Sequence, residues 1–136
     1  MIGIDRLRKV DFLQELTEEE LRSVAHFFKE KDVGAGITLC EEGATAGRLY
    51  VLEQGRISIN SSYSRKYYIE TPGKTVGWSF LVPPFVYTAS AITVTPSKLL
   101  VIENPRFYDV IHKEPKMELK VLSNMAQLIA SRLRGT

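Results

Sequence analysis

The sequence has little cysteine, histidine and net charge, and each shortage argues against a class of function. A single cysteine, Cys40, cannot form a disulfide within the chain, and it excludes an all-cysteine zinc or iron–sulfur site. The two histidines, His26 and His112, lie in the N-terminal helical segment and after the β segment, so they do not suggest a metal cluster inside the β structure. The formal net charge of +2 is too small to indicate binding to nucleic acid. We therefore predict no metal, no cofactor and no nucleic-acid partner.

Long hydrophobic runs are also missing. The longest apolar segment, residues 76–89, is short for a bilayer span and is interrupted by Pro83 and Pro84. The first residues, Met1–Asp5, lead straight into a charged amphipathic segment and do not resemble a signal peptide. The apolar share of 44% and the charged share of 25% are typical of globular proteins. These features predict a cytoplasmic protein with no membrane partner.

The first 30 residues have helical patterns. Thr17 and Glu20 have the spacing of a capping box, in which each side chain bonds the backbone N–H of the other residue. A helix over 18–29 would turn Leu21, Val24 and Phe28 toward the interior. We predict N-terminal helices over residues 1–30.

Residues 31–103 consist of short apolar runs separated by glycines, which is typical of antiparallel β structure. Gln54-Gly55 is predicted to be a hairpin turn, and Ser61–Lys66 the tip of another hairpin. The fold class predicted is mainly β with flanking helices: an antiparallel eight-stranded, jelly-roll-like β-roll. The expected strands are Ile37–Cys40, Arg48–Leu52, Arg56–Asn60, Tyr67–Glu70, Ala89–Val94 and Lys98–Ile102.

Helical periodicity returns over residues 104–134. Asn104 is a good N-cap before Pro105, and Pro115 opens the last helix. The apolar surface of that helix is wider than one stripe, so one part can cover the roll while another contacts a partner. The predicted seam of a homodimer, or of a complex with another protein, consists of Leu122, Met125, Ile129 and Leu133.

The order of these elements resembles the cyclic-nucleotide-binding domain family, which includes the effector domain of catabolite-activator-type regulators. The resemblance covers about residues 7–134. It is carried by Phe12-Leu13-x-x-Leu16-Thr17-x-x-Glu20-Leu21, Gly36-Ile-Thr-Leu-Cys-Glu-Glu-Gly43, Leu49-Tyr50-Val51-Leu52-x-x-Gly55-x-Ile57, Pro72-Gly73-x-x-x-Gly77 and Ala91 through Ile102. It implies one domain over residues 1–136. In the transcription factors of the family a DNA-binding domain follows the last helix, and because this sequence ends at Thr136 we expect none here.

The resemblance also implies where a ligand would bind, and there the sequence departs from the family pattern. A phosphate-binding cassette follows the glycine matched by Gly77; its glutamate holds the ribose and its arginine the cyclic phosphate. Here Trp78 stands at the glutamate position and Tyr87, followed by Thr88, at the arginine position. The sequence thus looks like a divergent branch with Gly-Trp-Ser in place of Gly-Glu. The candidate pocket residues are Gly77, Trp78, Ser79, Phe80, Leu81, Tyr87, Thr88 and, on a final helix that can cap the ligand, Arg132.

Three states of this pocket remain open. In the first, aromatic side chains fill the pocket. In the second, the pocket is reshaped for an apolar or aromatic ligand that the Tyr87 and Thr88 hydroxyls orient. In the third, backbone N–H groups at residues 79–81 still hold a nucleotide. A charge-assisted hydrogen bond contributes about 1.5–3 kcal/mol, so losing two anchors costs about 3–6 kcal/mol. Such a loss changes a micromolar site to about millimolar.

The expected function is a stand-alone regulatory sensor with weak or no affinity for cyclic AMP and cyclic GMP. The alternative is a module that dimerises or docks a partner and has a filled pocket. The sequence shows no nucleophile triad and no metal cluster, so we expect no enzyme activity.

Overall fold

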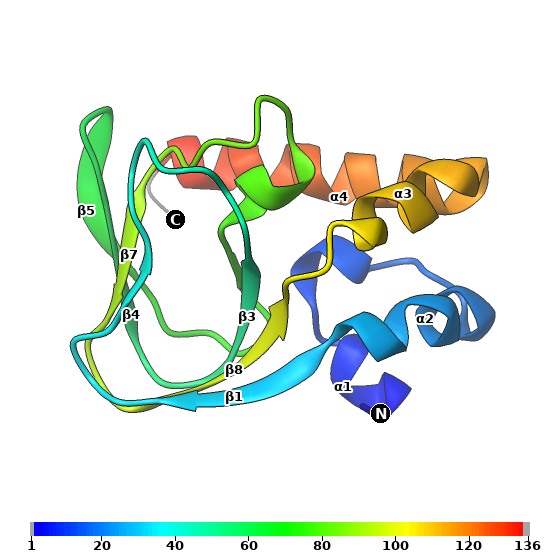
Figure 1. The fold of residues 1–136 in the computed structure, drawn as a ribbon, viewed down its shortest axis with the longest axis horizontal. Coiled ribbons are helices and arrows are strands. Elements are labelled where there is room, and N and C mark those ends of the chain that lie inside the picture. The colour runs from blue at the N-terminus through cyan, green and yellow to red at the C-terminus, as the bar shows by residue number, and fades with distance from the viewer. Residues whose placement is uncertain (1, 135–136) are drawn as a thin grey trace.

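The computed structural model describes residues 2–134 and consists of a β-roll with helices packed along one side and across one end (Figure 1). The roll has two four-stranded sheets in which all neighbouring strands are antiparallel. The first contains β1 (Lys29–Val33), β8 (Ser97–Ile102), β3 (Leu49–Gln54) and β6 (Thr75–Val76), in that order. The second contains β2 (Thr38–Cys40), β7 (Ser90–Thr93), β4 (Ile57–Ser61) and β5 (Ser64–Ile69). The predicted eight-stranded β-roll is confirmed in these residues.

Helical segments precede and follow the roll. The α-helices are α1 (Ile4–Leu7), α2 (Glu18–Val24), α3 (Arg106–Lys113) and α4 (Pro115–Leu133); the 3₁₀ turns are η1 (Asp11–Leu13), η2 (Ala25–Phe27) and η3 (Trp78–Leu81). The capping box of Thr17 and Glu20 is present at the start of α2, and α4 begins at Pro115 as predicted. Within the described residues, no helix is both long and apolar enough to cross a lipid bilayer.

Strand β8 separates two hydrophobic cores. Leu99 and Val101 pack inside the roll, whereas Leu100 and Ile102 pack against the helices. Because successive side chains of a strand point to opposite faces, β8 is buried on both sides, which explains its uninterrupted apolar sequence.

The predicted helix over 18–29 is too long. The α-helix ends at Val24, the η2 turn follows, and Lys29–Val33 forms strand β1. This polar segment has little strand pattern of its own, but its backbone pairs with β8 from Lys29↔Val101 to Val33↔Ser97. Long-range backbone pairing therefore sets the end of the helix, which local periodicity cannot indicate. The short strand β6 was also missed.

The prediction of a hairpin at Gln54-Gly55 is wrong. Strands β3 and β4, on either side of this turn, belong to different sheets. The neighbours of β3 are β8 and β6, and those of β4 are β7 and β5, so the turn carries the chain from one sheet to the other. The second predicted hairpin is present, because β4 pairs with β5 from Ile57↔Ile69 to Ser61↔Ser64.

Helix α4 lies across the end of the roll and over the N-terminal segment (Figure 1). Lys120 Nζ is 2.7 Å from Glu20 Oε1, and Asn124 Nδ2 donates to the carbonyl oxygens of Phe12 and Gln14 at 3.1 and 2.7 Å. These polar contacts hold one face of α4 against the chain's own N-terminal segment.

The predicted partner seam on α4 is not one continuous surface. Met125 is only 3% exposed and belongs to the core between the helices and the sheet, so its assignment to the seam is wrong. It shares the inward face with Val121 and Leu128, which are separated from it by one helical turn in either direction. Ile129 is half-buried; the large apolar side chains that α4 does expose are Leu119, Leu122 and Leu133.

Candidate functional site: a cavity between the roll and the last turn of α4

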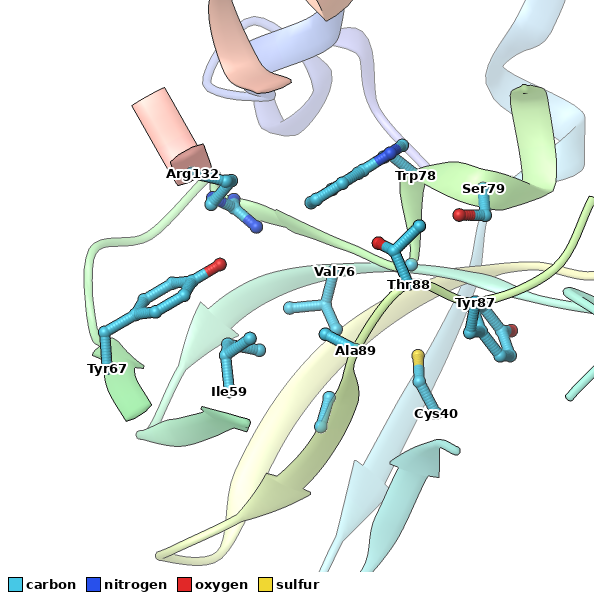
Figure 2. Close-up of a pocket in the computed structure, with 12 residues that line it drawn as sticks. Cys40, Ile59, Tyr67, Val76, Trp78, Ser79, Tyr87, Thr88, Ala89 and Arg132 are labelled. Carbon is cyan, nitrogen blue, oxygen red and sulfur yellow. The ribbon is translucent and has the colours of Figure 1, made fainter. Parts of the chain in front are cut away.

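A small cavity of about 20 Å³ lies where η3, the roll and the C-terminal turn of α4 meet (Figure 2). This volume has room for about one or two water molecules, whereas ligand pockets usually have about 300–1,000 Å³. In this conformation the cavity is therefore too small for a nucleotide-sized molecule. Its lining residues are Cys40, Ile59, Tyr67, Val76, Gly77, Trp78, Ser79, Tyr87, Thr88, Ala89, Ala91 and Arg132.

Gly77 lets the chain turn from β6 into η3 at the wall of this cavity. Its φ of +86° lies in the left-handed region, which side chains other than glycine rarely adopt. A Cβ at this position would be 3.1 Å from the Arg48 carbonyl oxygen and 3.2 Å from Cys40 Sγ. Both the conformation and the close packing therefore explain a glycine here.

Trp78 and Arg132 close the cavity from two different elements. Trp78 extends from η3 across the cavity, and Arg132 approaches it from α4 (Figure 2). The Arg132 Cζ atom is 5.9 Å from the centre of the Trp78 ring, within the range of a cation–π contact. The side chain of Arg132 is only 4% exposed.

Thr75, in β6, connects the N-terminal segment to α4. Its backbone N–H and its hydroxyl donate to the two carboxylate oxygens of Asp11, at 3.0 and 2.5 Å. Its carbonyl oxygen accepts a hydrogen bond of 2.6 Å from Arg132 Nη2. The same Arg132 nitrogen is 3.9 Å from Asp11 Oδ2, a distance for an ion pair but too long for a hydrogen bond.

The Tyr87 hydroxyl is used by the protein itself. It donates to the Arg48 carbonyl oxygen at 2.6 Å and accepts from the Arg48 N–H at 3.1 Å. In this structure the hydroxyl is thus bonded to the backbone of Arg48, the residue before β3, and a ligand that it orients would have to share or replace these bonds. Burial raises the pKa of Tyr87 above its usual value, and burial raises the pKa of the Cys40 thiol to about 12. Both groups therefore stay protonated and neutral at pH 7.

The structure divides the other candidate residues. Ser79 and Thr88 line the cavity, but Phe80 and Leu81 do not, because the η3 turn directs them into the core beside the helices. Of the cassette aromatics, only Trp78 and Tyr87 reach the cavity; Phe85 instead packs on Tyr108, with ring centres 5.4 Å apart. Of the aromatic side chains expected to fill the pocket, Trp78 and Tyr87 thus lie at the cavity, and Arg132 joins them from α4.

Sequence reasoning missed Asp11, Tyr67 and Thr75. Tyr67 lines the cavity; burial raises its pKa, and the nearby Arg132 charge acts in the opposite direction. Strand β5 (Ser64–Ile69) has no apolar–polar alternation in its sequence, so no local pattern indicates that Tyr67 faces a helix from the other end of the chain. Asp11 and Arg132 are 121 positions apart, and no local pattern connects them.

Known proteins share this architecture. A candidate cyclic nucleotide-binding protein from Geobacter metallireducens GS-15 is 28% identical and superimposes with a TM-score of 0.85, covering 98% of this chain and 99% of its own. A cyclic nucleotide-binding domain from Methylobacillus flagellatus KT has 19% identity, a TM-score of 0.75, and coverage of 97% of this chain and 76% of its own. The catabolite activator protein of Thermus thermophilus has 22% identity, a TM-score of 0.68, and coverage of 92% and 59%. At these last two identities the likeness concerns the fold alone.

Among functionally curated proteins, none matches this chain at a significant level. The family model described as the cyclic nucleotide-binding domain matches residues 30–114, from the second residue of β1 to the residue before α4. This match spans more than half of the chain and includes every strand of the roll, together with η3. The chain belongs to the cyclic nucleotide-binding domain family.

Proposed function

We propose that this chain is a non-catalytic regulatory module of the cytoplasm in which a small molecule enters beside η3 and changes the position of α4. One observation carries the proposal: Arg132 of α4 lines the same cavity as Gly77, Trp78 and Ser79 of the cassette. A ligand that separates Trp78 from Arg132 must act on the last turn of α4. Binding shifts such an equilibrium only if the ligand contacts the two helix positions differently, and a lining residue on the helix provides that difference.

Cyclic AMP and cyclic GMP are expected to bind weakly. Trp78 and Tyr87 stand where the family resemblance requires a glutamate and an arginine, and neither supplies the missing charge. Because the cavity is too small for a nucleotide, binding must also supply the free energy that enlarges it. The loss of about 3–6 kcal/mol predicts affinities near the millimolar range.

Trp78 provides the test, because it is the only tryptophan of the chain and lies at the cavity. The protein is titrated with cyclic AMP, cyclic GMP and a panel of metabolites while tryptophan emission is followed. Thermal melting checks each hit, since a ligand that binds only the folded state raises the melting temperature. We expect one class of compound to give a saturable change together with faster hydrogen exchange in α4. A saturable ligand that leaves the exchange of α4 unaltered would contradict the proposed signalling role.

A second candidate function is a module that docks a partner or a second copy through α4. The observation in its favour is the exposure of Leu119, Leu122 and Leu133, of which Leu122 is 51% exposed. Three large apolar side chains on the outer surface of one helix are consistent with a contact surface.

The variant Leu122→Glu tests this second function. If two copies meet through α4, each loses the burial of a leucine worth about 1.5–3 kcal/mol, so the dimer weakens by at least about 100-fold. Analytical ultracentrifugation should then show a monomer where the unmodified protein is a dimer. Ser123→Glu, which adds the same charge at the neighbouring exposed position, is the control. If both variants and the parent protein sediment identically, the outer face of α4 does not take part in self-association.

A further inference from the structure

The charge of the cavity comes from α4 and not from the roll. Among the described residues that line it, Arg132 has a formal positive charge, and the others are apolar or neutral at pH 7. With its side chain 4% exposed, Arg132 is shielded from solvent, so its attraction for an opposite charge is stronger than at a surface. The family resemblance places an arginine in the cassette, whereas this chain has a guanidinium from a different element near the same cavity.

The present hydrogen-bond acceptor of Arg132 can be replaced by one that carries a negative charge. The hydrogen bond of 2.6 Å goes to the Thr75 carbonyl, which is a neutral group. The carboxylate of Asp11 is bonded to the N–H and the hydroxyl of Thr75, and it remains 3.9 Å from Arg132. A guanidinium can donate two parallel hydrogen bonds to a phosphate or carboxylate and also gains the attraction of opposite charges, whereas the Thr75 carbonyl oxygen accepts one bond and has no formal charge. An anion that enters the cavity can therefore compete with Thr75.

We propose that the ligand of this cavity is an aromatic anion, and that it binds by replacing the Thr75 carbonyl oxygen as the hydrogen-bond acceptor of Arg132. The inference rests on the proposed function and names the chemical class of its ligand. The anion, a phosphate ester or a carboxylate, pairs with the guanidinium, and the aromatic part packs on Trp78, with Tyr67 on the opposite side of Arg132 (Figure 2). This exchange breaks the hydrogen bond between Arg132 of α4 and Thr75 of β6. The binding free energy of the ligand therefore favours a different position of the last helical turn.

The test compares matched compounds that differ in charge. Cyclic AMP is paired with adenosine, and benzoate with benzamide, each titrated to millimolar concentration while Trp78 emission is followed. We expect at least one anion to give a saturable change and its neutral counterpart to give none. A response to cyclic AMP alone identifies the phosphate ester as the source of the charge, and a response to benzoate alone identifies the carboxylate.

Two variants then locate the charge. Arg132→Gln should weaken binding of the active anion about 10- to 150-fold, which corresponds to losing one charge-assisted hydrogen bond. Arg134→Gln removes an exposed arginine two positions further on and should leave the affinity unchanged. Arg132→Lys keeps the positive charge but not the planar guanidinium. Its affinity for the anion should lie between those of Arg132→Gln and Arg134→Gln. If Arg132→Gln does not fold, the matched compounds and the lysine variant still decide the question.

The outcomes separate this inference from the proposed function. A neutral compound that binds as tightly as its anion, or an anion whose affinity is the same in Arg132→Gln and the parent protein, overturns the anionic class while a sensor remains. If neither cyclic AMP nor benzoate changes Trp78 emission, the anionic ligand class is also overturned, even if another compound of the metabolite panel binds and alters α4. Binding of an anion through Arg132 without any change in hydrogen exchange of α4 supports the ligand class but contradicts the sensor.

Discussion

Replacing Gly73 with alanine is expected to destabilise the fold by about 2–4 kcal/mol, a large share of the stability of a small domain. Its φ of +94° lies in the left-handed region, and an added Cβ would be 1.9 Å from the Lys9 carbonyl oxygen. A backbone atom cannot move aside as a flexible side chain can, so the N-terminal segment must shift. Urea denaturation followed by circular dichroism measures the loss.

Gly34→Ala is the matched control. At this position an added Cβ meets no atom within 4 Å, and φ is not in the left-handed region. Its effect should stay within about 0.5 kcal/mol, as for most surface substitutions. Equal stabilities of the two variants would show that the contact between Gly73 and Lys9 is looser than the structure indicates.

Phe107→Ala is expected to cost about 3–5 kcal/mol, as is typical for the truncation of a buried phenylalanine. Phe107 is 0% exposed, and its ring makes edge-to-face contacts with Phe12, Phe27 and Phe28 at centroid distances of 6.1, 5.4 and 6.0 Å. The cavity left by alanine would lie between α3 and the N-terminal segment, where several rings lose a partner at once. Thermal and urea unfolding should both record the loss.

Tyr63→Ala provides the comparison for the loss of an aromatic ring without burial. Tyr63 is 88% exposed at the tip of the β4–β5 hairpin, and its removal should change stability by less than about 0.5 kcal/mol. A small effect of Phe107→Ala, close to that of Tyr63→Ala, would mean that the aromatic cluster does not hold the helices to the roll.

Features that depend on neighbouring residues were predictable from the sequence. The capping box needs only Thr17 and Glu20, and the start of α4 needs only Pro115, so local chemistry sets both. The family resemblance placed the cassette at Gly77 and Trp78, and the structure finds both at the cavity.

Features that depend on distant residues were not predictable. Lys29–Val33 is a strand because β8 is available to pair with it, and its own sequence is too polar to indicate this. Met125 was assigned to a partner surface because 3–4 spacing identifies an apolar face without saying what covers it. The orientation of Arg132 depends on the packing of α4 over η1 and β6, which brings residues from opposite ends of the chain together.

The two-sided burial of β8 has a consequence for the way the protein unfolds. Leu99 and Val101 on one side, and Leu100 and Ile102 on the other, attach the same backbone to both cores. Neither the roll nor the helical layer can melt without exposing apolar surface of the other. Calorimetry should therefore show a single cooperative transition, with equal calorimetric and van't Hoff enthalpies, despite the two separate cores. Stabilisation gained at the cavity would then spread over the whole molecule, including the aromatic cluster around Phe107.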